Sequence, residues 1–228
     1  MQSEESIRIK VGPTVITGTW LPVVDAKGVI LIALSSSSGR WSLRNRYPAD
    51  VCRRNGFDVL LLDLLDSAED RKAACRLDAR LLQTRLSEGV NWITRRDSVA
   101  DLPIGLLVAN TAAAAALLLA ADSHSRIRAI VARSARPNLA SSVLSVVKCP
   151  TFLIVASGEH PTIVEANQRA YRELQCVKKL SIVPSASRLF TEGDALQEMA
   201  VLAADWFRRH MVANGDQDFE TDPVQAAG

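Results

Sequence analysis

The sequence predicts an α/β fold, with a mostly parallel sheet flanked by helices. Short apolar runs alternate with helix-like segments along most of the 228 residues, a pattern typical of strands joined by right-handed helical crossovers. Several runs are apolar without interruption, as expected of strands covered on both faces. The composition, 48% hydrophobic and 23% charged residues, fits a globular domain that needs no disulfide or metal to fold.

The strands are predicted from apolar runs and turn signals. A strand pair at the edge of the sheet is expected over residues 11–20, because Gly12 and Pro13 form a turn signal there. Six further apolar runs predict buried strands at residues 29–34, 59–64, 104–108, 127–132, 151–156 and 180–183.

The helices are predicted from their periodicity and end signals, at residues 44–55, 73–96, 111–121, 161–174 and 192–211. Asn55 and Gly56 end the first of them. The second carries leucines on one face and charges on the other, and Gly89 is a point where it is expected to break or bend. The alanines of the third suit close packing on a sheet.

Residues 1–212 are predicted to form a single domain, and residues 213–228 a flexible acidic tail without apolar periodicity. Residues 103–121 approach the length of a membrane span, but the polar pair Asn110 and Thr111 in the middle favours a strand followed by a helix. We therefore expect no membrane insertion.

Charge and cysteine usage narrow the function classes. The 27 basic residues nearly cancel the 25 acidic ones, so a nucleic-acid partner is not expected. The four cysteines form no CxxC pair, and no histidine lies at metal-ligand spacing from them, which argues against a zinc site. Scattered cysteines after a polar N-terminus predict a cytoplasmic protein.

Functional groups of a parallel sheet gather at the carboxyl ends of its strands. Four such ends lead into polar loops, at residues 35–40, 109–112, 157–160 and 184–190. Their order and spacing resemble the α/β-hydrolase superfamily in its dienelactone-hydrolase-like branch, which includes bacterial hydrolases sometimes fused to phosphoribosyltransferases. The resemblance covers about residues 11–210 and rests on the segments RWSLRNR at 40–46, DVLLLDLL at 58–65, RSARPNLA at 133–140, and Leu189-Phe190.

The sequence departs from this family at its catalytic positions. The family places a serine in a G-x-S-x-G turn between strand and helix, where this chain has Asn110 flanked by Val108 and Ala112. The matched acid is Glu159, and the matched base is Arg188. An amide is no nucleophile, and an arginine stays protonated at any working pH. The usual His-Gly pair of the oxyanion side is Leu34-Ser35 here.

Loss of the nucleophile or the base of a serine triad costs about 10⁶ in turnover. The leading hypothesis is therefore a catalytically degenerate hydrolase homologue, a pseudoenzyme that acts by binding a ligand or a protein. The alternatives are a serine-type or non-standard ester or lactone hydrolase of the dienelactone hydrolase family with weak activity, and a small-molecule sensor that uses the old pocket. No cofactor or metal is expected. A small anionic ligand, a protein partner and a homodimer all remain open.

Two hypotheses concern the altered site. In the first, Arg188 bonds Glu159 and the Asn110 amide and so plugs the former active site. In the second, Arg188 holds an anionic ligand together with Arg40 or Arg44. Ser35 and Ser36 are ligand-binding candidates in an anion-binding loop, although a plain polar loop is the simpler interpretation.

Other polar residues are expected to be structural. Ser157, Ser185 and Ser187 would satisfy local backbone groups, and His160 would stand exposed at a helix start. The segment from residue 40 to residue 54 also carries a cluster of basic residues, which is expected to form a solvated helix face rather than a contact site. This basic cluster consists of Arg40, Arg44, Arg46, Arg53 and Arg54.

Overall fold

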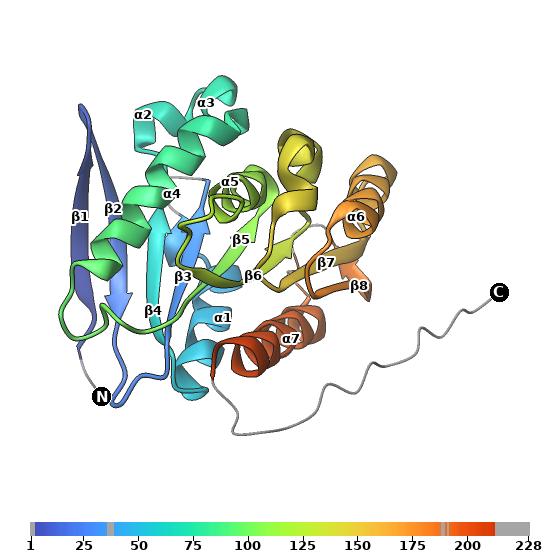
Figure 1. Ribbon diagram of the computed structural model, residues 1–228. Coiled ribbons are helices and arrows are strands. Elements are labelled where there is room, and N and C mark those ends of the chain that lie inside the picture. Colours follow the sequence, from blue (N-terminus) through green and yellow to red (C-terminus); the bar gives the residue numbers. More distant parts are fainter. Residues whose placement is uncertain (1–2, 36–38, 188–189, 191, 213–228) are drawn as a thin grey trace.

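The structure is a computed structural model that describes residues 3–35, 39–187, 190 and 192–212. In these ranges eight strands form one sheet in the order β1-β2-β4-β3-β5-β6-β7-β8 (Figure 1). Their bounds are Glu5–Val11 (β1), Thr14–Leu21 (β2), Val29–Leu34 (β3), Asp58–Asp63 (β4), Ile104–Ala109 (β5), Ile127–Arg133 (β6), Thr151–Gly158 (β7) and Lys178–Ser187 (β8). The predicted tail, 213–228, lies outside the described residues.

The sheet is parallel from β4 to β8, whereas β2 runs antiparallel to both β1 and β4. This confirms the predicted α/β class with a mostly parallel sheet. The predicted edge hairpin is present, and its turn contains Gly12 with a positive φ of 58°. Its first strand begins at Glu5, earlier than the sequence predicted.

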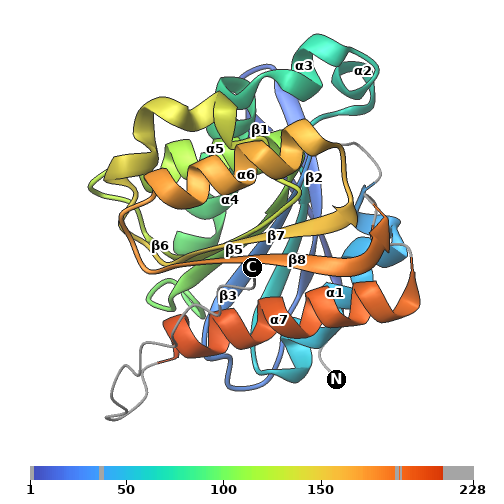
Figure 2. The same ribbon diagram turned by 90° about the vertical axis from the view of Figure 1, so that its right-hand side faces the viewer.

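Helices cover both faces of the sheet (Figures 1 and 2). The helices are α1 (Leu43–Arg54), α2 (Ser67–Asp70), α3 (Ala73–Leu77), α4 (Ala79–Thr94), α5 (Asn110–Ala120), α6 (Pro161–Glu173) and α7 (Gly193–Met211), with 3-10 segments η1 (Gly39–Trp41) and η2 (Pro137–Val146). α1 and α7 lie on one face, and α4, α5 and α6 on the other. Successive residues of β3 therefore enter two separate cores, Ile30 and Ile32 one and Leu31 and Ala33 the other.

The prediction of one helix over residues 73–96 is wrong, because Asp78 interrupts it. The Asp78 carboxylate accepts hydrogen bonds from the backbone N–H groups of Arg80 and Leu81, so it caps the start of α4. Gly89 neither breaks nor ends α4. A Cβ there would lie 2.5 Å from Leu62 Cδ2, so this glycine permits close packing of helix on sheet.

Gly18 in β2 is expected to tolerate no side chain. A Cβ at this position would lie 2.7 Å from the carbonyl oxygen of Leu61 and 3.0 Å from Cγ1 of Ile7. We expect Gly18→Ala to lower the free energy of unfolding by about 1–3 kcal/mol, because backbone of the paired strand cannot move away cheaply. Urea denaturation measures this loss.

The control is Gly193→Ala, at the exposed start of α7, where an added Cβ meets nothing within 4 Å. It is expected to be neutral or slightly stabilising, since alanine lowers the entropy of the unfolded chain. Equal losses in the two variants would contradict the steric argument.

Among the helices of the described ranges, none combines the length and apolarity that a membrane span needs.

Candidate functional site

The turn between β5 and α5 has the strained geometry of a nucleophile elbow. Asn110 is the first residue of α5 and has a φ of 52°, in the left-handed region. Asparagine tolerates this region better than most non-glycine residues. Val108 and Ala112 replace the flanking glycines and are both buried, so the turn forms without them. The backbone N–H of Arg136 donates to the Asn110 carbonyl at 3.2 Å.

The side chains at the elbow differ sharply in exposure. Asn110 is exposed to solvent, while the neighbouring Thr111 is buried, with 2% of its surface exposed. The Thr111 hydroxyl is therefore shielded from a ligand in the site. What the elbow presents to solvent is a side-chain amide, together with the first N–H groups of α5.

Glu159 follows β7 at the matched acid position and is buried, with 8% of its surface exposed. Its Oε1 accepts a hydrogen bond of 3.1 Å from the backbone N–H of His160. His160 is exposed and caps α6, with its Nδ1 2.9 Å from Thr162 Oγ1. The predicted position of His160 at a helix start is confirmed, and its side chain contacts Thr162 within that cap.

The matched base, Arg188, lies outside the described residues, as does Ser36. The pairing of Arg188 with Glu159 or Asn110 therefore stays a prediction. Ser35 lies at the end of β3, partly exposed. Ser187 donates both its backbone N–H and its hydroxyl to Glu192 Oε2, each at 3.0 Å, in keeping with a structural role. Ser157 is exposed.

Arg40 is held inside the fold, next to the end of β4. Its Nη1 lies 2.6 Å from Asp63 Oδ2 and also donates to the Thr17 hydroxyl. The Arg40 backbone N–H donates to Asp63 Oδ1 at 3.3 Å. Burial raises the pKa of Asp63 to about 6, although the Arg40 charge and hydrogen bonds lower it. This pair fixes η1 at the rim of the site, where Trp41 is exposed and the Arg40 guanidinium lies 5.2 Å from its ring.

Arg44 and Arg133 place two positive charges at the same strand ends. Arg133 is the last residue of β6 and donates to the Arg44 carbonyl at 3.2 Å and to Asn45 Oδ1 at 3.1 Å. Its guanidinium also lies 5.9 Å from the Phe190 ring. Burial, together with the Arg44 charge, lowers the pKa of Arg133 to about 10. Within the described residues, neither arginine has a carboxylate in ion-pair contact.

Sequence reasoning missed Arg133 as a site residue, although it begins the quoted segment RSARPNLA. Its position at the end of a buried strand was the available signal. The space that Arg44, Asn45 and Arg133 enclose with the ends of β3 and β5 is almost filled, with a cavity volume of about 10 Å³.

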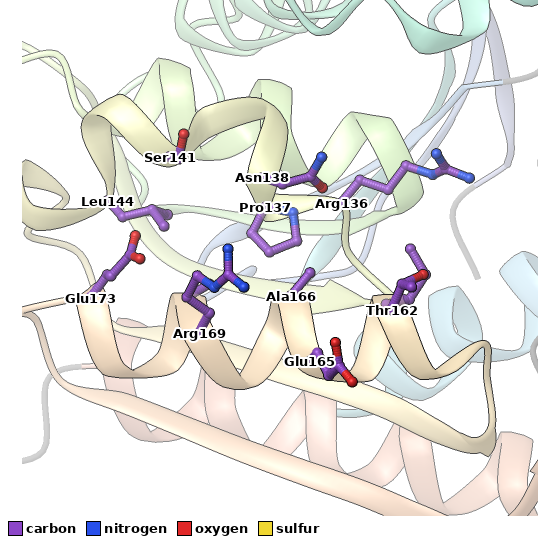
Figure 3. Close-up of a pocket in the computed structure, with 12 residues that line it drawn as sticks. Arg136, Pro137, Asn138, Ser141, Leu144, Thr162, Glu165, Ala166, Arg169 and Glu173 are labelled. Carbon is purple, nitrogen blue, oxygen red and sulfur yellow. The ribbon is translucent and has the colours of Figure 1, made fainter.

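An open groove begins at the acid position. A space of about 570 Å³ is bounded by Glu159, His160, Arg136, Thr162 and neighbouring backbone. It adjoins a second space of about 480 Å³ between η2 and α6, which shares Arg136 and Thr162 with it (Figure 3). Figure 3 shows Arg136 and Thr162 at one end of this second space and Glu173 and Leu144 at the other.

The strand order, the elbow after β5 and the acid position after β7 define the α/β-hydrolase fold. Solved structures agree. A dienelactone hydrolase from Anabaena variabilis has a TM-score of 0.83 and 37% identity, covering 92% of this chain and 98% of that chain. The chain therefore belongs to the dienelactone hydrolase family. The Pyrococcus furiosus esterase Pf2001, with a TM-score of 0.72 and 17% identity, covers 92% of this chain and 93% of its own and shows the same fold.

Curated relatives extend the comparison to longer proteins. Two Mycobacterium tuberculosis proteins, each named "Putative phosphoribosyl transferase", are 39% identical over 212 residues, which is 93% of this chain. The match spans 48% of each of those proteins, so the chain corresponds to about half of their length. No protein-family model matches the chain.

Proposed function

We propose that this member of the dienelactone hydrolase family binds a small anion at the elbow site and does not hydrolyse esters. The observation that carries the proposal is Asn110, which is exposed on the turn with a φ of 52°. The elbow geometry persists, but its side chain is an amide, which a general base cannot deprotonate to a useful nucleophile. The side chain at the elbow could therefore hydrogen-bond a ligand but could not attack an ester.

The residue types around Asn110 support the same interpretation. The sequence puts Arg188 at the matched base position, and an arginine cannot accept a proton there. His160 serves as the cap of α6. When the nucleophile or the base of a serine triad is removed, turnover falls by about 10⁶. Family membership nevertheless keeps a weak, non-standard ester or lactone hydrolase as the second candidate.

The charge distribution favours an anion. Arg44 and Arg133 stand at the strand ends beside the elbow without a carboxylate partner among the described residues. The start of α5 adds free N–H groups and the positive end of a helix dipole. A carboxylate or phosphate next to Asn110 would receive hydrogen bonds from the amide and would compensate the two guanidinium charges.

The name of the mycobacterial relatives refers to phosphoribosyl transfer. The part of those proteins that matches this chain is half of their length, and here it adopts the α/β-hydrolase fold. We therefore do not assign that activity to this chain. A cytoplasmic location, a homodimer and a protein partner stay predictions.

Turnover of p-nitrophenyl acetate at high protein concentration tests the loss of catalysis. We expect the wild type and an Asn110→Ala, Arg188→Ala double variant to give the same rate, because neither side chain can act as nucleophile or base. A wild-type rate clearly above that of the double variant would support the second candidate and reject the pseudoenzyme.

Thermal unfolding in the presence of benzoate, succinate or inorganic phosphate tests the anion site. We expect one class of anion to raise the melting temperature of the wild type, and Arg44→Gln to weaken its binding about tenfold. Arg54→Gln is the matched control, since it removes the same charge from an exposed position at the last residue of α1, whereas Arg44 lies in the first turn of that helix. An equal effect of the two variants, or no stabilisation of the wild type, would contradict the proposal.

A further inference from the structure

Two cysteines that are 27 positions apart in the sequence lie just before the starts of two neighbouring strands. β7 and β8 are parallel, and Thr151 is the register partner of Lys178. Cys149 and Cys176 each lie two residues before one of these partners. The backbone N–H of Thr151 donates to the Val177 carbonyl at 2.9 Å. This hydrogen bond joins the two backbone segments directly beside the cysteines.

The two thiols also lie on the same side of the sheet. Cys149 is part of the core under α4, α5 and α6, and Cys176 packs against that core. The Thr151 hydroxyl donates to the Cys149 carbonyl at 3.0 Å. Burial raises the pKa of both thiols, the neighbouring Cys176 thiol raises that of Cys149 further, and hydrogen bonding with Thr151 opposes these effects. Thr151 thus contacts both cysteines, and both are free thiols.

We propose that Cys149 and Cys176 are a redox pair that a peroxide oxidises to a disulfide joining the start of β7 to the start of β8. Neighbouring strands place Cα atoms within the separation that a disulfide requires. The other two cysteines do not fit. Cys52 belongs to the core on the opposite face of the sheet, and Cys75 lies on α3.

The reaction balances with hydrogen peroxide as the oxidant. Cys176, the more exposed thiol, loses its proton and attacks the peroxide as a thiolate. The O–O bond breaks, the sulfur becomes a sulfenic acid, and the departing hydroxide takes up the thiol's proton and leaves as water. The Cys149 sulfur then attacks that sulfur, the S–S bond forms, and a second water leaves. The two electrons come from the two sulfur atoms. Because burial is the main effect on both thiols and raises each pKa, oxidation is expected to accelerate as the pH rises.

The cross-link would close a loop that contains β7, Glu159 and α6. A closed loop of this length restricts the unfolded chain, so we expect the oxidised protein to melt roughly 5–10 °C above the reduced one. The disulfide would form at the end of the sheet away from the elbow. It would therefore act on the stability of the unit that carries Glu159 and leave the anion site open.

The test treats the reduced full chain with a small excess of hydrogen peroxide at mildly alkaline pH. We expect the intact mass to fall by the mass of two hydrogen atoms, and two of the four free thiols to disappear. Proteolysis of the unreduced product should yield one linked peptide pair that contains Cys149 and Cys176. Dithiothreitol should restore the original mass and melting temperature.

Variants separate this pair from general oxidation. Cys176→Ser should abolish the mass loss and the rise in melting temperature, while Cys75→Ser, which removes another partly exposed thiol, should preserve both. Addition of oxygen in place of hydrogen loss, a linked peptide containing Cys52 or Cys75, or an unchanged melting temperature after cross-linking would overturn the proposal. Peptide mapping of the wild type keeps the test valid even if a serine variant fails to fold.

Discussion

Replacing Arg40 by alanine is expected to lower the free energy of unfolding by about 3 kcal/mol, because it leaves a buried carboxylate without its charge partner. The Asp63 side chain is 1% exposed and lies 2.6 Å from the Arg40 guanidinium. At neutral pH its charge would keep only hydrogen bonds from neighbouring backbone N–H groups. Urea denaturation measures the loss. The slope of the unfolding free energy against urea concentration should be the same in the variant and the wild type.

Arg46→Ala is the matched control for this experiment. Arg46 also forms an ion pair of short distance, 2.5 Å to Glu4, but the two side chains are 26% and 44% exposed. Solvent screens such a pair, so we expect a loss below about 1 kcal/mol. Comparable losses in the Arg40 and Arg46 variants would show that burial of Asp63 does not dominate the energetics of the Arg40 pair.

The sequence predicted the strands well because a strand covered on both faces must be apolar throughout. β3 has the bounds expected from the apolar run at residues 29–34. The prediction failed where a short polar signal opposed a long periodic pattern. Asp78 is a preferred N-cap residue, and Asp66 with Glu69 forms a capping box at α2. Both signals were present in the sequence, but the leucine periodicity concealed the first.

The site could be predicted only as far as its residues follow strand ends in a known order. Asn110 and Glu159 were located in this way. The role of Arg133 could not be predicted in this way, because it depends on which groups of α1 lie against the end of β6. The Arg40–Asp63 pair depends on where η1 lies against the end of β4, and the proposed pair of Cys149 and Cys176 depends on the register of β7 and β8. Local composition encodes neither. The sequence analysis, which treated the four cysteines as scattered, therefore did not suggest the second of these pairs.

The pH dependence of stability is expected to reveal Asp63 as a group that opposes folding when it is ionised. Burial raises the pKa of this carboxyl from 3.8 to about 6 in the folded chain. The folded state therefore holds the proton more tightly than the unfolded state. The resulting contribution to stability is complete below about pH 4 and is lost as the pH rises to about 6, with a total loss of about 3 kcal/mol.

Asp63→Asn removes this titration while preserving the shape of the side chain. Other titrating groups are common to both chains, so their effects cancel when the unfolding free energy of Asp63→Asn is subtracted from that of the wild type. We expect this difference to fall by about 3 kcal/mol between about pH 4 and pH 7. A difference that stays constant or rises with pH would mean that Arg40 holds the carboxylate at or below its ordinary pKa. In that case, charge pairing would outweigh burial at the rim of the site.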